Sequence, residues 1–267
     1  MRVVWLGHST VLVEVAGLRL ITDPLLREHI GPLRRAVPLP PGVASDLSGS
    51  VDAVLLSHLH LDHCDLPSLR MLHARVVVGP PGSKEWLARQ GVANAVELTP
   101  GEVFHLSDQV IVTAATAHHP DRRTPWGPVA QPVGHIVQGP EHAAWFAGDT
   151  SLFPEMAELP AATRHGLDLA VVPIWGWGPT LGPGHLDPRA AAQAVVLATA
   201  RHVIPVHWGT LYPLGLRAAM RRHLQDPAAD FTTHLATTAA AAAVDAEAHV
   251  LGVGGHLDLP AQPLPGP

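Results

Sequence analysis

Residues 51–65 read VDAVLLSHLHLDHCD, a short apolar run followed by a segment that holds three histidines. The apolar run at its start predicts a buried β-strand, so the polar residues after it stand where a strand ends and a loop begins. His58 and His60 are two residues apart, and in an extended segment their side chains therefore point the same way. Asp62 and His63 follow after the chain has begun to turn, where they can face a second metal. Imidazole and carboxylate ligands at this spacing suit zinc and metals of similar preference.

The bulk composition excludes several classes of protein. The chain has 267 residues, of which 47% are hydrophobic, so it can bury a sizeable core. Its net charge is −6 and it carries no block of Lys or Arg, so we expect no nucleic-acid partner. The single cysteine, Cys64, excludes an internal disulfide, fits a reducing compartment and is interpreted as a small buried residue. The chain shows neither a signal-peptide layout nor an apolar run of membrane-spanning length, so we expect a cytoplasmic protein. The sequence is compatible with a monomer and with a homo-oligomer.

The N-terminal part predicts a β-meander of three short strands at residues 2–6, 11–15 and 18–21. His8 lies in the first turn, where it either makes a local hydrogen bond or lies near the metal site. Asp23 ends the third strand, and it is either an ordinary turn residue before proline or a carboxylate that orients a metal-bound histidine.

The remaining pattern alternates strands with helices. Further strands are expected at residues 75–78, 96–98, 103–106, 110–113, 134–138, 142–146, 169–174, 202–206 and 249–253. Helices are expected at residues 66–72, 83–90, 155–164, 187–200 and 214–224, whereas 27–50 is expected to be a loop. This order predicts an α+β fold in which two sheets lie inside and the helices lie outside.

The stretch SHLHLDHCD, residues 57–65, resembles the signature of the metallo-β-lactamase superfamily. Residues 5–10 (WLGHST) and 21–24 (ITDP) resemble one branch of it, which contains the ascorbate phosphate lactonases and the N-acylphosphatidylethanolamine phospholipase D enzymes. The resemblance implies a four-layer αββα sandwich, with a single domain over residues 1–259 and a disordered tail at 260–267.

The same resemblance implies the remaining metal ligands. A strand runs into His118-His119-Pro120, and the residue before the break, His119, matches the third ligand of the first metal, with neighbouring His118 as the alternative. Asp149, in a Gly-Asp-Thr motif, would bridge two metals, and His207 matches the last ligand position. The implied set is His58, His60 and His119 for one metal, Asp62, His63 and His207 for the other, and Asp149 between them.

Two further features lie near these motifs. His185 precedes the helix start Asp187-Pro188, and in the resembling branch a histidine at this place lies beside the metals without binding them. It either helps to cap the helix or stabilises the oxyanion or protonates the leaving group. The loop that holds Trp175 and Trp177 either packs over the sheet end or forms a wall of the substrate pocket.

These features together predict a dinuclear hydrolase, with Asp62 and His185 as its catalytic residues. A metal-bridging hydroxide would attack an ester, a lactone or a phosphodiester of a small molecule or a lipid. Zinc is the first choice for both metals, because no cysteine is in a ligand position, with manganese or iron left open. The alternative is a metal-binding or regulatory protein that uses the same scaffold without turnover.

Overall fold

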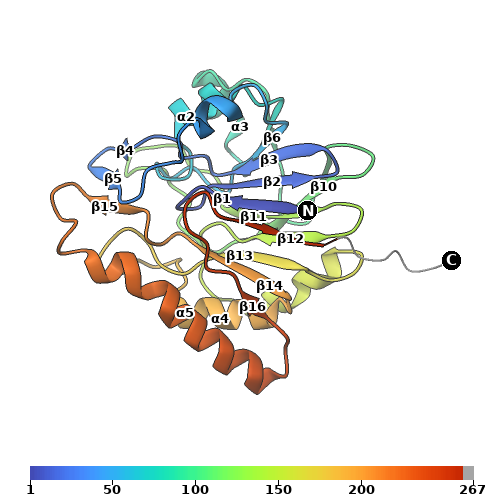
Figure 1. Cartoon of the computed structure of the whole chain (residues 1–267). Coiled ribbons are helices and arrows are strands. Elements are labelled where there is room, and N and C mark those ends of the chain that lie inside the picture. Colours follow the sequence, from blue (N-terminus) through green and yellow to red (C-terminus); the bar gives the residue numbers. More distant parts are fainter. Residues whose placement is uncertain (261–267) are drawn as a thin grey trace.

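Two seven-stranded sheets lie face to face in the computed structural model, which describes residues 1–260 (Figure 1). The first sheet has the order β17 (His256–Asp258), β1 (Arg2–Trp5), β2 (Val11–Val15), β3 (Leu18–Thr22), β6 (Ala53–Leu55), β7 (Val76–Gly79) and β8 (Ala95–Glu97). The second has the order β16 (Glu247–Ala248), β14 (His202–Val206), β13 (Leu169–Pro173), β12 (Ala143–Phe146), β11 (Val133–Gln138), β10 (Ile111–Thr116) and β9 (Val103–His105).

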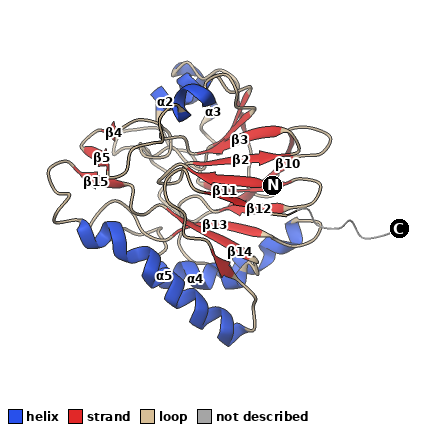
Figure 2. Ribbon diagram, viewed as in Figure 1, coloured by secondary structure: helices blue, strands red, loops and turns tan. Residues whose placement is uncertain are grey.

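Helices cover the two outer faces of this pair of sheets. Figure 2 shows α2 (Leu66–Leu72) and α3 (Lys84–Arg89) beyond the first sheet, and α4 (Pro188–Leu197) and α5 (Arg221–Ala242) beyond the second. Asp65 caps α2 by accepting a hydrogen bond from the Ser68 amide at 3.2 Å, and Asp187 caps α4 in the same way. The layer order helix, sheet, sheet, helix confirms the predicted αββα sandwich.

Apolar side chains fill the space between the sheets and the space under each helix layer. Val3 and Val13 of the first sheet belong to the same buried cluster as Val137 and Val171 of the second. Strands such as β13 are buried on both faces, which is why they read as continuous apolar runs and not as alternating patterns. No helix within residues 1–260 is both long and apolar enough to cross a membrane.

The strand directions bring several loops to one end of the sandwich. In the first sheet β3 pairs with β6 in parallel, and β1 runs in the same direction because two antiparallel pairings separate it from β3. In the second sheet β12, β13 and β14 are parallel, and β10 shares their direction for the same reason. The loops that follow these strands therefore meet at one edge, and they carry the predicted site residues.

Residues 27–50 were predicted to be a loop, and this prediction was wrong. They contain β4 (His29–Ile30), β5 (Leu33–Arg35) and the short helix α1 (Val43–Leu47). β5 pairs with β15 (Leu211–Pro213), which lies far away in sequence, to form a small third sheet. Strands this short have no detectable period, and a distant partner decides that they form.

The prediction was also wrong after residue 213. Of the helix expected at 214–224, residues 214–220 form turns and 221–224 begin α5 (Arg221–Ala242), a helix that continues through Pro227. Pro227 lies inside this helix, where it cannot donate to the helix ladder. The buried residues Phe231, Leu235 and Ala239 recur every four positions and hold the helix in place. The strand expected at 249–253 is replaced by β16 and β17.

The other predicted elements are found with small shifts in their ends. The helix predicted at 155–164 is a 3₁₀ helix, η1 (Pro154–Ala162). Most of the tail predicted at 260–267 lies outside the described residues.

Candidate metal centre

All seven residues predicted as metal ligands lie at the edge where the parallel strands end. The loop after β6 supplies four of them, and the loops after β10, β12 and β14 supply one each. These residues are His58, His60, Asp62, His63, His119, Asp149 and His207. Two groups of metal-ligating atoms contain most of them, His58 with His60 and His119, and Asp62 with His63, His207 and the further residue His8, with the atoms of each group within 4.8 Å of one another. Asp149 forms another such group with His119 and His185, and Asp23 forms one with His58 and His63.

The first group presents imidazole lone pairs to a common point. His119 Nε2 and His60 Nδ1 are 2.9 Å apart. The other nitrogen of His119 donates to the Gly184 carbonyl at 2.7 Å, and the other nitrogen of His60 donates to the Arg122 carbonyl at 3.1 Å. A neutral imidazole has one hydrogen, so the two facing nitrogens are both lone pairs. They repel each other unless a cation lies between them, which is the arrangement that a metal site requires.

His58 is oriented toward the same point by a chain of hydrogen bonds. The Ser57 hydroxyl donates to Asp23 Oδ2 at 2.6 Å, so it accepts from His58 Nδ1 at 2.9 Å. His58 Nε2 is therefore a lone pair, and it is buried without a hydrogen-bond partner anywhere in residues 1–260. A buried acceptor without a partner is costly, and a metal ion would satisfy it.

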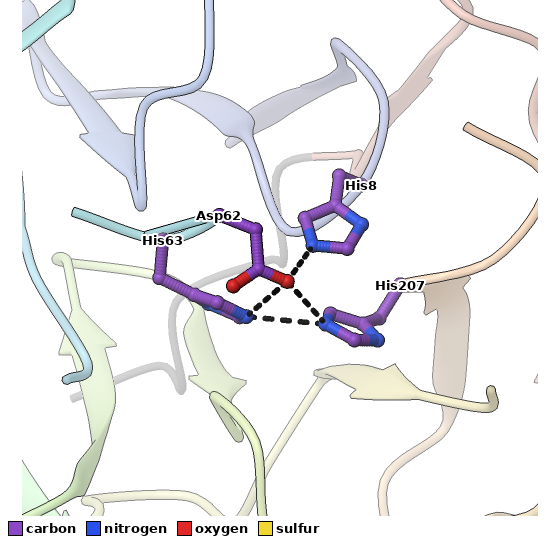
Figure 3. Close-up of side chains that lie close together, drawn as sticks. All are labelled: His8, Asp62, His63 and His207. Carbon is purple, nitrogen blue, oxygen red and sulfur yellow. Dashed lines mark hydrogen bonds and ion pairs between the residues drawn. The ribbon is translucent and has the colours of Figure 1, made fainter. Parts of the chain in front are cut away.

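The second group contains His63 and His207, whose Nε2 atoms lie 3.1 Å apart (Figure 3). His63 Nδ1 donates to Asp23 Oδ2 at 2.8 Å, and His207 Nδ1 donates to the Trp175 carbonyl at 2.8 Å. Asp62 Oδ2 lies 3.9 Å from His63 Nε2 and 3.7 Å from His207 Nε2. Of the two interpretations of Asp23, the structure favours a carboxylate that orients histidines, because Asp23 orients His63 directly and His58 through Ser57.

His8 belongs to this second group, although sequence reasoning placed it no more closely than near the site. Its Nε2 lies 2.9 Å from Asp62 Oδ2, and its ring centroid lies 4.0 Å from that of His207. Burial, with a further contribution from His207, lowers the pKa of His8 to about 3. His8 is therefore neutral, and its Nε2 hydrogen donates to the Asp62 carboxylate and fixes its direction. The sequence signal for a His8 position near the centre is the Gly-His turn that directly follows a strand.

Asp149 lies between the two groups. Its Oδ2 is 3.2 Å from the Nε2 atoms of both His63 and His207, and it is 4.0 Å from His119 Nε2. Its Oδ1 is buried without a hydrogen-bond partner among the described residues. Burial alone would raise the pKa of Asp149, but His207 and His63 hold it well below the usual value. The group is therefore a carboxylate with one oxygen free to accept a cation.

The histidines of the two groups differ in pKa. Burial lowers the pKa of His58 far below 6.5 and that of His119 to about 4, and it also lowers the pKa of His60. Burial acts against protonation of His63 and His207 as well, but the neighbouring carboxylates outweigh it there. The pKa of His207 rises to about 9 and that of His63 lies well above its usual value, with Asp149 as the largest raising influence on both.

His118 and His185 occupy different places. The ring of His118 packs on Phe153, with centroids 4.4 Å apart, and it is in none of the metal-ligating groups, whereas His119 is. His185 Nε2 lies 3.4 Å from Asp149 Oδ2, and Asp187, not His185, caps the following helix.

A cavity of about 370 Å³ opens onto the centre. Ile30, Leu33, Leu61 and Trp177 give it apolar walls, and His60, Asp62, Asp149 and His185 lie at its base with Arg123. Of the two tryptophans in their loop, Trp177 lines this cavity, and Trp175 instead stacks on His223. A second cavity of about 480 Å³, between residues 36–37 and the start of α5, contacts none of the seven residues.

The sequence is similar to a known protein family and to several curated proteins. A family model described as a β-lactamase superfamily domain matches residues 19–208. A metal-dependent hydrolase of Opitutus terrae is 34% identical over 217 residues, which cover 79% of this chain and 86% of that protein. An uncharacterized protein of Mycobacterium tuberculosis is 31% identical over 224 residues, and the match covers 77% of this chain but only 58% of that protein.

Solved structures show the same fold. Igni18, a metallo hydrolase of Ignicoccus hospitalis, superposes with a TM-score of 0.70 at 20% identity, and the match covers 96% of this chain and 97% of that one.

Proposed function

This chain belongs to the β-lactamase superfamily, and we propose that it is a metal-dependent hydrolase with a dinuclear centre. The observation that carries the proposal is the orientation of the imidazoles. In each of five histidines one nitrogen is bonded to a fixed protein group and the other is directed inward, as in metal sites. The five are His58, His60, His63, His119 and His207.

The donor set fits two divalent cations. His58, His60 and His119 would hold one, Asp62, His63 and His207 would hold the other, and Asp149 would be shared. Five imidazoles and two carboxylates without a thiolate suit zinc first, and manganese or iron use the same donors. Such a pair of cations supplies an acidified water and neutralises negative charge that develops on the substrate.

The side chains around the cations have separate tasks in this proposal. Asp149 stays ionised because its pKa is far below neutrality, so it keeps its charge through the reaction. Asp62 is held in one direction by His8 at 2.9 Å. His185 faces the cavity with Nε2 3.4 Å from Asp149 Oδ2 and Nδ1 3.2 Å from the Gly182 carbonyl. In its protonated form, the Nε2 hydrogen can be donated to the substrate oxygen or to the leaving group.

The cavity favours a carboxylic ester or a lactone as the substrate class. Its walls are mainly apolar, and Arg123 is the one guanidinium that lines it. That guanidinium donates to the carbonyls of Leu59 and Cys64 and lies over the Trp86 ring, so these contacts already hold it in place. A phosphodiester or a phospholipid, as in the branch that the N-terminal segments resemble, is the second candidate.

The test combines metal analysis with a substrate panel. Zinc-supplemented protein should carry at least two equivalents of metal and should hydrolyse members of a panel of lactones, esters, phosphodiesters and phospholipids. His185→Ala should keep both metals and lose about 10²-fold or more in turnover. Less than one equivalent of metal in wild-type protein would contradict the dinuclear centre. Two equivalents without turnover of any member would favour the metal-binding or regulatory alternative.

A further inference from the structure

A second cluster of metal-ligating side chains lies at the opposite end of β14. His202 is the first residue of β14, Glu247 is the first residue of β16, and His249 directly follows β16. The two strands are parallel neighbours with His202 opposite Glu247, and the His249 amide donates to the Val203 carbonyl at 2.8 Å. Because Glu247 and His249 are two residues apart in extended backbone, they share the face on which His202 lies.

The ligand atoms are spaced as one cation requires. His202 Nδ1 and His249 Nε2 are 3.0 Å apart, and Glu247 Oε2 lies 3.7 Å from the first and 3.8 Å from the second. Zinc binds imidazole nitrogen at about 2.0–2.1 Å, so two nitrogens of a tetrahedral site are about 3.3 Å apart. The three atoms therefore need to move by only fractions of an ångström to share an ion.

Solvent exposure leaves the cluster accessible to an ion and to water. The His202 and His249 side chains are 30% and 19% exposed, and Glu247 is 68% exposed. The imidazoles are thus held by the strands, while the carboxylate can swing to close the site. Two imidazoles with one carboxylate and an open fourth position form a common zinc ligand set.

This cluster is independent of the centre described above. His207 follows the last residue of β14, so the strand separates the two by about 16 Å. Figure 1 shows β14 and β16 beside α5, which lies between them in sequence.

We propose that His202, Glu247 and His249 bind one divalent cation of the zinc type, which fastens the edge strand β16 to β14. β16 has only two residues, and its pairing rests on few hydrogen bonds, including that from the Glu247 amide to the Arg201 carbonyl. A metal would cross-link residue 202 to residues 247 and 249 and so close the segment that contains α5. An ion that binds only the folded chain also stabilises it.

The experiment compares zinc binding by the full-length wild type, Glu247→Gln and His249→Ala. Zinc content after dialysis and the zinc-dependent rise in Tm are both measured. We expect each variant to carry one equivalent less than the wild type, whatever the wild-type number, and to lose part of the Tm rise. Glu247→Gln keeps the shape of an exposed side chain, so it should fold normally.

His256→Ala is the matched control. His256 is an edge-strand histidine 3.6 Å from Asp258, but it belongs to none of the three-residue ligand groups. It should keep the wild-type zinc content. Equal zinc content and equal Tm rise in the wild type and both variants would overturn the proposal, and the cluster would then be a plain hydrogen bond between two histidines.

Discussion

Both halves of the candidate metal centre are built mainly from histidines, but the histidines of the two halves differ in protonation. His58, His60 and His119 form a group of neutral rings, whose pKa values burial lowers. His63 and His207 lie against carboxylates that raise their pKa values, to about 9 in His207. The first half therefore offers free lone pairs at neutral pH, whereas in the second half a cation must displace protons.

The contrast between the two halves shows that carboxylates have two opposing effects in a metal site. They attract the cation, but in its absence they attract protons to the neighbouring imidazoles just as well. The first half should fill without proton release, and the second should depend on pH.

Asp149→Asn should weaken both halves together, because it removes the negative charge that they share. We expect metal content to fall by more than one equivalent relative to the wild type and turnover to fall at least about 100-fold. Elemental analysis and initial rates measure this. The control is Asp121→Asn, in an exposed loop. Equal metal retention in both variants would show that Asp149 is not shared.

His60→Ala should empty the first half and spare the second. His60 is only partly buried, so the fold should tolerate the change. We expect one equivalent of metal less than in the wild type, with turnover lost, because the proposed hydrolysis uses both cations. Loss of both equivalents would mean that the halves bind cooperatively and do not act as separate sites.

His8→Asn should weaken the second half alone. The backbone of His8 has a φ of 53°, a left-handed conformation that asparagine tolerates, while the shorter side chain no longer orients Asp62. We expect about a tenfold loss of affinity for the second metal. Stepwise zinc titration against a competing chelator measures both affinities, and an equal loss in both steps would place His8 outside the second half.

Proton release should distinguish the two binding steps. The raised pKa values of His207, about 9, and of His63 mean that the metal-free second half holds protons at neutral pH. Binding of the second cation expels these protons, so its affinity should fall as the pH drops. The first cation meets neutral rings, because the pKa of His119 is about 4. Calorimetry at pH 7.5 in two buffers of different ionisation enthalpy should show release in one step only. Proton release in the first binding step instead would mean that the protonated half, with His63 and His207, binds its cation first.

Much of this centre could be predicted from the sequence because its information is local. Four of the seven predicted ligands lie within six residues, 58–63, directly after an apolar strand, so strand periodicity and spacing alone place them together. The buried strands and the capped helices α2 and α4 were also found from local patterns. The superfamily resemblance then added His119, Asp149 and His207.

The remaining features depend on contacts between residues far apart in sequence. No periodic sequence pattern indicates three of these features. They are the β4–β5–β15 sheet that borders the cavity, the course of α5 through Pro227, and the hydrogen bond from His8 to Asp62. Strand register alone brings His202 beside Glu247. The sequence by itself therefore determined the residue types of the candidate centre and the strand ends that carry them. Only the tertiary structure decided which nitrogens meet and which hold protons, because burial and the distance to a carboxylate set the pKa and are properties of the folded chain.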